Sequence, residues 1–179
     1  MLAAILQSSL IRLIPVGMMM LALQRTIFTE IRVSGVIIQV VLAFVASAGA
    51  SGGSERGAVA GFVLGSMFDL VEGTPLGSTA IAFTLAGVVA GLLALVAADP
   101  QWWLNAIFIG FGAAVGEAMV PVVRLFIGET NPWPADMLNV IVIVALTSML
   151  LGPVMLPISR WCLKIRGSAW IAPAEQSPI

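Results

Sequence analysis

The sequence predicts an all-α integral membrane protein that folds as a compact bundle of about six transmembrane helices. Its 179 residues are 60% hydrophobic and 9% charged, whereas ordinary soluble domains are about 45 to 50% apolar and about 25% charged. Apolar runs close to the length of about 20 residues that crosses a bilayer recur along the chain, separated by short polar segments. Small residues spaced four apart within these runs are typical of helices that pack closely in membranes.

The apolar runs, taken in order, predict six spans. The first contains Arg12 near its start, and this side chain can extend toward water. A polar connector follows the first span, and a flexible Gly/Ser turn at residues 51–54 follows the second. The predicted spans are residues 10–28, 35–50, 57–71 and 78–98, a fifth that begins at Trp102, and residues 137–159.

The third span carries the most regular pattern in the sequence. Gly57, Gly61 and Gly65 recur every four residues and form two overlapping GxxxG pairs. Residues at this spacing share one helix face, and glycines there let a second helix approach until the two backbones touch. We expect this stripe to be either an internal packing face or a face that binds a partner.

Asp69 continues the stripe with a carboxylate, among residues that are otherwise small or apolar. Such a charge must reach the membrane interface, the bundle interior or a hydrogen-bond donor. One interpretation is a cap for the following turn or for the next helix's N-terminus. The other is a polar contact with a partner on the outer side of the membrane. Residues 72–77 form a turn cluster that ends the helix.

The fifth span combines interfacial tryptophans with two charged residues. Trp102 and Trp103 at its start are typical of a membrane interface. Glu117 and Arg124 are secondary candidates for a functional role. They are seven residues apart, or about 10 Å along a helix, which is too far for direct pairing unless Pro121 bends the helix. For Glu117 we expect a structural hydrogen bond rather than a proton relay.

The composition excludes several functions. The chain has no His and no Tyr, and Cys162 is its single cysteine. An internal disulfide, a Cys/His zinc site and His-based acid–base catalysis are therefore excluded. No basic stripe is present that would neutralise nucleic-acid phosphates. We expect no catalytic, cofactor-binding or metal-binding residues, and no nucleic-acid partner.

The distribution of basic residues predicts the orientation. With six spans both termini lie on one side, and the positive-inside rule makes that side the cytoplasm. We expect residues 1–166 to form the six-span domain and residues 167–179, which lack apolar periodicity, to be a disordered cytoplasmic tail. The cluster after the last span is a topology signal, or it contacts anionic lipid or a cytoplasmic filament. The basic residues on the cytoplasmic side are Arg12, Arg56, Arg160, Lys164 and Arg166, against Arg25, Arg32 and Arg124 outside.

A longer motif extends from the glycine stripe through residues 57–91. It consists of a Gly-Phe pair, a Gly three residues after the Phe, an Asp four residues further on, and a Leu-Gly pair after a turn. In this motif the sequence resembles the MreD family of rod shape-determining bacterial membrane proteins. Ile38 and Gln39 depart from that family, because many relatives have Pro followed by Asp or Asn there. The residues that carry the resemblance are Gly61, Phe62, Gly65, Asp69, Leu76 and Gly77.

The resemblance implies a non-enzymatic scaffold of the cell-wall elongation machinery in the bacterial cytoplasmic (inner) membrane. Such a scaffold helps maintain rod shape by linking peptidoglycan synthesis enzymes to MreC and to the cytoplasmic MreB filament. The implied partners are MreC, MreB, the RodA glycosyltransferase and a class B penicillin-binding transpeptidase, together with membrane lipid.

Two other functions are weighed against the scaffold. The alternative is the substrate-binding membrane subunit of an energy-coupling-factor vitamin transporter, which is also a bundle of about six spans. Members of that family often carry an AxxxA contact on the first helix, and residues 10–28 lack one. An intramembrane enzyme comes third, because the sequence contains no HExxH motif and no Ser/His or Cys/His combination.

Overall fold

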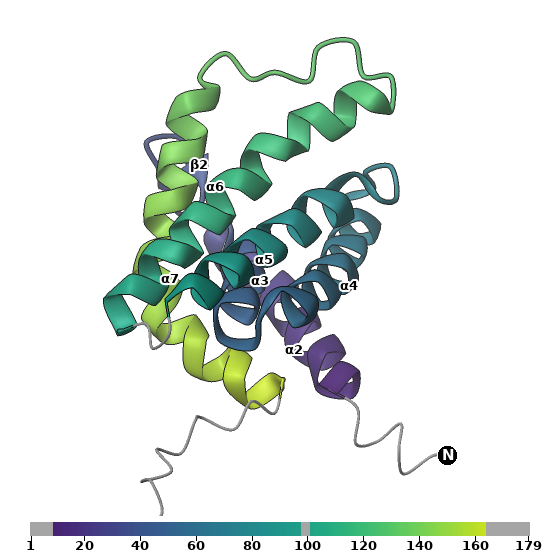
Figure 1. Ribbon diagram of the computed structural model, residues 1–179. Helices are drawn as coiled ribbons and strands as arrows, with labels where there is room; N and C mark the ends of the chain where they lie inside the picture. The colour runs from purple at the N-terminus through teal and green to yellow at the C-terminus, as the bar shows by residue number, and fades with distance from the viewer. Residues whose placement is uncertain (1–8, 98–100, 164–179) are drawn as a thin grey trace, which may run out of the picture.

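The computed structural model describes residues 9–97 and 101–163, and this part of the chain is predominantly helical (Figure 1). It contains six α-helices, a short π-helix and a two-stranded antiparallel hairpin. The helical fold class predicted from the sequence is thereby confirmed. In chain order the elements are α2 (Ser9–Leu23), η1 (Gln24–Phe28), β1 (Arg32–Val33), β2 (Val36–Ile37), α3 (Val40–Gly52), α4 (Ser54–Glu72), α5 (Ser78–Val96), α6 (Trp102–Phe126) and α7 (Met137–Cys162).

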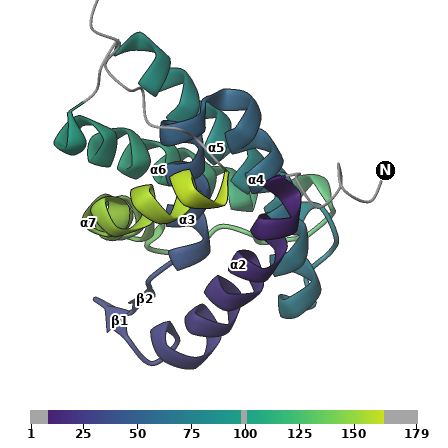
Figure 2. The ribbon, with the colours of Figure 1, turned by 90° about the horizontal axis from the view of Figure 1, so that it is seen from below.

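Helix α3 lies at the centre of the bundle. Every residue from Val40 to Ala50 is buried, and the helix contacts α2, α4, α5, α6 and α7. Figure 2 shows α3 surrounded by these helices. The helix contains only apolar and small residues and no charge, which is the composition expected of a helix buried on all sides.

The predicted span of residues 35–50 begins later than expected, because its first residues form a hairpin. Helix α3 starts at Val40, and β1 pairs with β2 just before it. Ser34 and Gly35 connect the two strands with φ angles of 49° and 84°. Two successive positive φ angles form the type I′ turn that suits the twist of a hairpin. A short apolar run such as the one after Gly35 can form either a strand or part of a buried helix, and periodicity alone does not distinguish the two.

The connection between α3 and α4 is tighter than the predicted flexible turn at residues 51–54. Helix α3 continues to Gly52 and α4 begins at Ser54, so that Gly53 alone separates them. Gly53 has φ 84° and ψ 171°, a conformation that is open to glycine and costly for other residues. Helix α4 therefore begins before the predicted span of residues 57–71.

The last predicted span, residues 137–159, is also longer in the structure. Helix α7 continues to Cys162 with Pro153 and Pro157 inside it. A proline inside a helix removes one backbone donor but need not end the helix. The predicted tail of residues 167–179 lies outside the described residues, as do Lys164 and Arg166.

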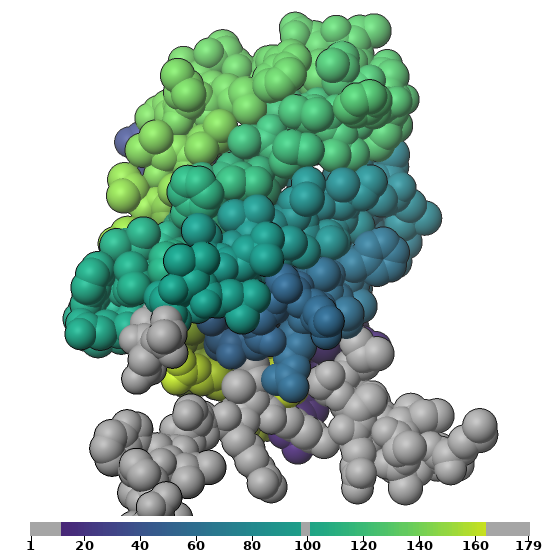
Figure 3. Space-filling model, viewed as in Figure 1, coloured from purple at the N-terminus to yellow at the C-terminus, as the bar shows by residue number. Residues whose placement is uncertain are grey.

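Among the described helices, α5, α6 and α7 are long and apolar enough to cross a membrane. Their outer faces carry large exposed apolar side chains, such as Leu95, Phe111 and Leu150, which suit contact with lipid. Figure 3 shows α5 and α6 on one broad face of the molecule. Helix α3 is also apolar, but its 13 residues are fewer than the roughly 20 that cross a bilayer.

Candidate functional site

The glycine stripe of α4 lies directly against the backbone of α5. A Cβ atom added to Gly65 would lie 2.5 Å from the Cα of Ala80, and one added to Gly61 would lie 2.6 Å from the carbonyl carbon of Phe83. Real Cβ contacts essentially never fall below 3.0 Å. Glycine is therefore required at both positions for α4 and α5 to pack at this distance.

Gly57 extends the same contact to a third helix. An added Cβ there would lie 2.7 Å from the carbonyl carbon of Gly87 on α5 and 2.7 Å from the Cα of Gly49 on α3. Gly91 on α5 likewise faces the backbone of Gly53 and Ser54. The stripe of α4 is thus an internal packing face, which is one of the two alternatives that the sequence left open.

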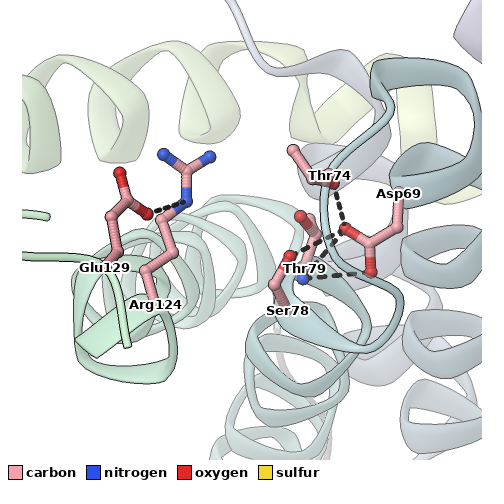
Figure 4. A network of polar contacts seen from close by, with 6 residues as sticks. All are labelled: Asp69, Thr74, Ser78, Thr79, Arg124 and Glu129. Carbon is pink, nitrogen blue, oxygen red and sulfur yellow. Dashed lines mark hydrogen bonds and ion pairs between the residues drawn. The ribbon is translucent and has the colours of Figure 1, made fainter. Parts of the chain in front are cut away.

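Asp69 ends the stripe in a dense hydrogen-bond network (Figure 4). Its side chain is 0% exposed. The hydroxyl groups of Thr74 and Ser78 donate to Oδ1 at 2.8 and 3.1 Å. The backbone N–H of Gly77 donates to Oδ2 at 2.9 Å, and that of Thr79 donates to both oxygens at 3.1 and 3.2 Å. Both carboxylate oxygens are used within the chain.

These bonds cap the N-terminus of α5 from another helix. The first N–H groups of a helix have no partner within it, and the N-cap residue normally supplies one from its side chain. Gly77 occupies the N-cap position and has no side chain. Asp69 therefore accepts from the amides of Thr79 and Ala80, and its negative charge opposes the positive end of the helix dipole.

The geometry of Asp69 corrects one expectation. The sequence allowed a polar contact between Asp69 and a partner on the outer side, but a fully buried carboxylate with both oxygens engaged offers no such contact. The turn around it is shaped by Gly73 and Gly77, which have φ angles of 70° and 99°. The carboxylate is a structural group that fixes this turn and the start of α5.

Phe62 and Leu76 are the two members of the motif that do not join this interior contact. Phe62 is 57% exposed on α4, and Leu76 is 69% exposed in the turn before α5. The motif thus has an internal part, which joins two helices, and an external part, which presents two apolar side chains at the surface.

A cavity of about 530 Å³ lies at the end of the bundle where Asp69 is found. Its walls come from η1, β2, the residue before α3, the end of α4 and the turn after it, the start of α5, the second half of α6, the loop before α7 and the start of α7. Five charged side chains line it, together with aromatic and aliphatic ones. The charged residues are Arg25, Glu72, Glu117, Arg124 and Glu129.

Glu117 and Arg124 both line this cavity, but within the described residues they do not form an ion pair with each other. Gln39 donates to Oε2 of Glu117 from Nε2 at 2.7 Å, as expected for a structural hydrogen bond. The Nε of Arg124 lies 4.0 Å from Oε2 of Glu129. Helix α6 continues through Pro121, so Glu117 and Arg124 remain seven residues apart on one helix.

Sequence reasoning missed two glutamines that organise this end of the molecule. Gln24 is buried, and its Oε1 accepts from the backbone N–H of Val41 at 3.0 Å, so it caps α3. Gln39, at the N-cap position of α3, instead points to Glu117. The π-helix at η1 places Gln24 and Arg25 beside the cavity, and such segments are frequent at functional sites. The signal available in the sequence was a polar residue on each side of the hairpin.

A second ion pair lies in the wall of the cavity beside η1. The Nε of Arg25 lies 3.2 Å from Oε1 of Glu72, at the end of α4. Within the described residues, no group of three His, Cys, Asp or Glu side chains is arranged to hold a metal ion. Because polar, charged and apolar side chains all line it, the cavity can offer hydrogen bonds, charge and apolar contact to a bound group.

Comparison of the chain with protein-family models, curated proteins and solved structures found no match.

Proposed function

We propose that this protein is a non-enzymatic scaffold of the machinery that elongates the bacterial cell wall. The observation that carries the proposal is that the interior motif residues all act at the junction of the same two helices. Gly61 and Gly65 join α4 to α5, and Asp69 and Gly77 fix the turn between the same two helices. Four of the six residues on which the resemblance to the MreD family rests thus belong to one structural unit, which supports that resemblance.

The proposal includes six membrane spans, with α2, α3 and α4 crossing the membrane beside α5, α6 and α7. Two contacts between the start of α2 and the end of α7 support an even number of spans. The guanidinium of Arg12 lies 5.2 Å from the ring centroid of Trp161, and its Nη1 donates to the carbonyl of Trp161 at 3.4 Å. The start of α2 and the end of α7 therefore lie on one side, which we assign to the cytoplasm of the inner membrane.

In this role the interior motif residues stabilise the scaffold, while Phe62 and Leu76 contact a partner. Both side chains are large, apolar and exposed, and they lie on the unit that the motif defines. The proposed partners are MreC, the MreB filament, RodA and a class B penicillin-binding transpeptidase. Membrane lipid covers the remaining apolar surface.

The experiment that tests the proposal replaces the gene in its rod-shaped host. Depletion of the protein should round the cells, and the unchanged chain should restore rods. Phe62→Ala with Leu76→Ala should leave the purified protein as stable as the parent but reduce the amount of MreC that co-purifies. Leu95→Ala, at an equally exposed leucine near the other end of α5, is the matched control and should change neither the stability nor the amount of MreC. Depleted cells that keep their rod shape would contradict the proposal.

The cavity supports a second candidate, the substrate-binding membrane subunit of an energy-coupling-factor vitamin transporter. A volume of about 530 Å³ lies in the range of about 300 to 1,000 Å³ for small-molecule sites. This candidate predicts that depletion abolishes uptake of a vitamin and leaves cell shape unchanged. It also predicts co-purification with ATP-hydrolysing subunits in place of MreC.

A further inference from the structure

The cavity contains one acidic and one basic side chain whose hydrogen-bonding capacity is only partly used. Within the described residues, Glu117 accepts one hydrogen bond, from Gln39 at Oε2, which leaves Oε1 available. Arg124 makes one ion-pair contact, through Nε, at the long distance of 4.0 Å. A guanidinium has five N–H donors, so its two terminal nitrogens are also available to a bound group.

The remaining charges of the cavity are less available. Arg25 and Glu72 form an ion pair at 3.2 Å, so each neutralises the other. Glu129 shares the long contact with Arg124, and its side chain is half exposed. Glu117 and Arg124 are therefore the pair of opposite charges that a ligand would meet.

The two residues lie two turns apart on α6. Seven residues on a helix correspond to about 10.5 Å along the axis. Both residues line the same cavity, and within the described residues they form no ion pair with each other, so a ligand that contacts both needs its positive and negative groups at separate ends.

Part of the cavity wall is apolar. Phe68 and Phe83 line the cavity with their rings in contact, at a centroid distance of 5.6 Å, and Val120 lies on α6 between Glu117 and Arg124. An aliphatic or peptide-like linker can pack there, whereas a second charged group cannot without losing its hydration.

We propose that this cavity binds a zwitterion, with a primary ammonium held by Glu117 and an anionic group held by Arg124. Two sources provide this chemistry: a free dipeptide-sized molecule, and the headgroup of phosphatidylethanolamine in the surrounding membrane. The site goes beyond the scaffold role and does not depend on it.

Binding is measured by calorimetry on the purified full chain in maltoside detergent, freed of lipid. The probes are alanyl-alanine and glycerophosphoethanolamine, which carry both charges. N-acetyl-alanyl-alanine lacks the ammonium, and alanyl-alanine amide lacks the carboxylate. We expect at least one of the two zwitterions to bind. If alanyl-alanine binds, each of its two blocked forms should bind about tenfold more weakly, because one charged hydrogen bond is lost.

Two variants assign each charge to its partner. Glu117→Gln should remove the preference for a free ammonium over the acetylated form, and Arg124→Gln should remove the preference for a free carboxylate over the amide. Each variant should still bind the probe that lacks the corresponding charge, which shows that the cavity is intact. The matched controls are Glu55→Gln and Arg56→Gln, at the exposed start of α4, and both should behave as the parent does.

A second arm identifies the source. If lipid is the source, the parent should unfold at a higher temperature in nanodiscs of phosphatidylethanolamine than of phosphatidylcholine, and Glu117→Gln should abolish the difference. If the source is free, alanyl-alanine should bind and the two lipids should act alike. Absence of probe binding at millimolar concentration together with equal stability in both lipids would overturn the proposal. The proposal would also be overturned if both variants kept the preference for the charged probes over the blocked ones. A structure of a complex in which a segment of a partner protein fills the cavity would overturn it as well.

Discussion

Asp69 caps α5 from a different helix because Gly77, at the N-cap position, has no side chain of its own. The turn before α5 therefore requires two glycines and one carboxylate together. Gly73 and Gly77 allow the turn to reverse, and Asp69 then satisfies the amides that the turn leaves without partners. Asp69, Gly73 and Gly77 thus together fix the turn between α4 and the start of α5.

The first prediction follows from the two acceptor oxygens of Asp69. Asp69→Asn replaces one acceptor with an NH₂ group that faces backbone donors, so we expect unfolding free energy to fall by about 1 to 3 kcal/mol. Asp69→Ala should cost at least as much. The measurement is denaturation of the purified variants in detergent.

Asp136→Asn is the matched control for this prediction. Asp136 holds the N-cap position of α7 but makes no side-chain capping hydrogen bond, so its replacement should leave stability unchanged. Equal stability of Asp69→Asn and the parent would show that the network around Asp69 contributes nothing to folding.

At the scale of helices, the contact between α4 and α5 depends on the absence of side chains at a few positions. Alanine normally favours a helix over glycine by about 1 kcal/mol. At Gly65, however, an added Cβ meets the Cα of Ala80 at 2.5 Å, and backbone cannot move aside as a flexible side chain does. Packing therefore outweighs helix propensity at this position.

The second prediction compares glycines with different neighbours. Gly61→Ala and Gly65→Ala should each lower stability by about 1 to 3 kcal/mol, as overpacking typically does. Gly152→Ala should be neutral or slightly stabilising, because its nearest neighbour is the end of the Ile109 side chain at 3.2 Å. Thermal unfolding of the purified variants tests this, and equal effects at Gly65 and Gly152 would refute the packing argument.

The sequence predicted most helices because long apolar runs and small-residue spacing are local signals. It did not predict the hairpin before α3, since the short run after Gly35 has no periodicity of its own. It offered capping by Asp69 as one of two alternatives. The choice between them required the distance between α4 and the start of α5, which depends on packing.

At the scale of the whole molecule, the cavity could not have been predicted from the sequence. Glu117 was a candidate, but its partner Gln39 is 78 residues away, and the walls come from segments spread over most of the described chain. Only the tertiary arrangement brings these residues to the same end of the bundle. The same arrangement brings Arg12 to Trp161 at the other end.

The third prediction concerns orientation. A reporter fused after Ile179 should be cytoplasmic, and one inserted at residues 130–134, in the loop between α6 and α7, should be external. The contact between Arg12 and Trp161 supports this assignment because it joins the start of α2 to the end of α7. If both reporters lie on the same side, the number of spans is wrong by one.

The fourth prediction tests the scaffold role most directly: identification of the proteins that co-purify with the unchanged chain from native membranes of its host, after crosslinking in living cells. We expect MreC as the main partner, with RodA and a class B transpeptidase, and a reduced yield of MreC for the pair Phe62→Ala and Leu76→Ala. Recovery of ATP-hydrolysing transporter subunits with no MreC would contradict the scaffold function and favour the transporter subunit.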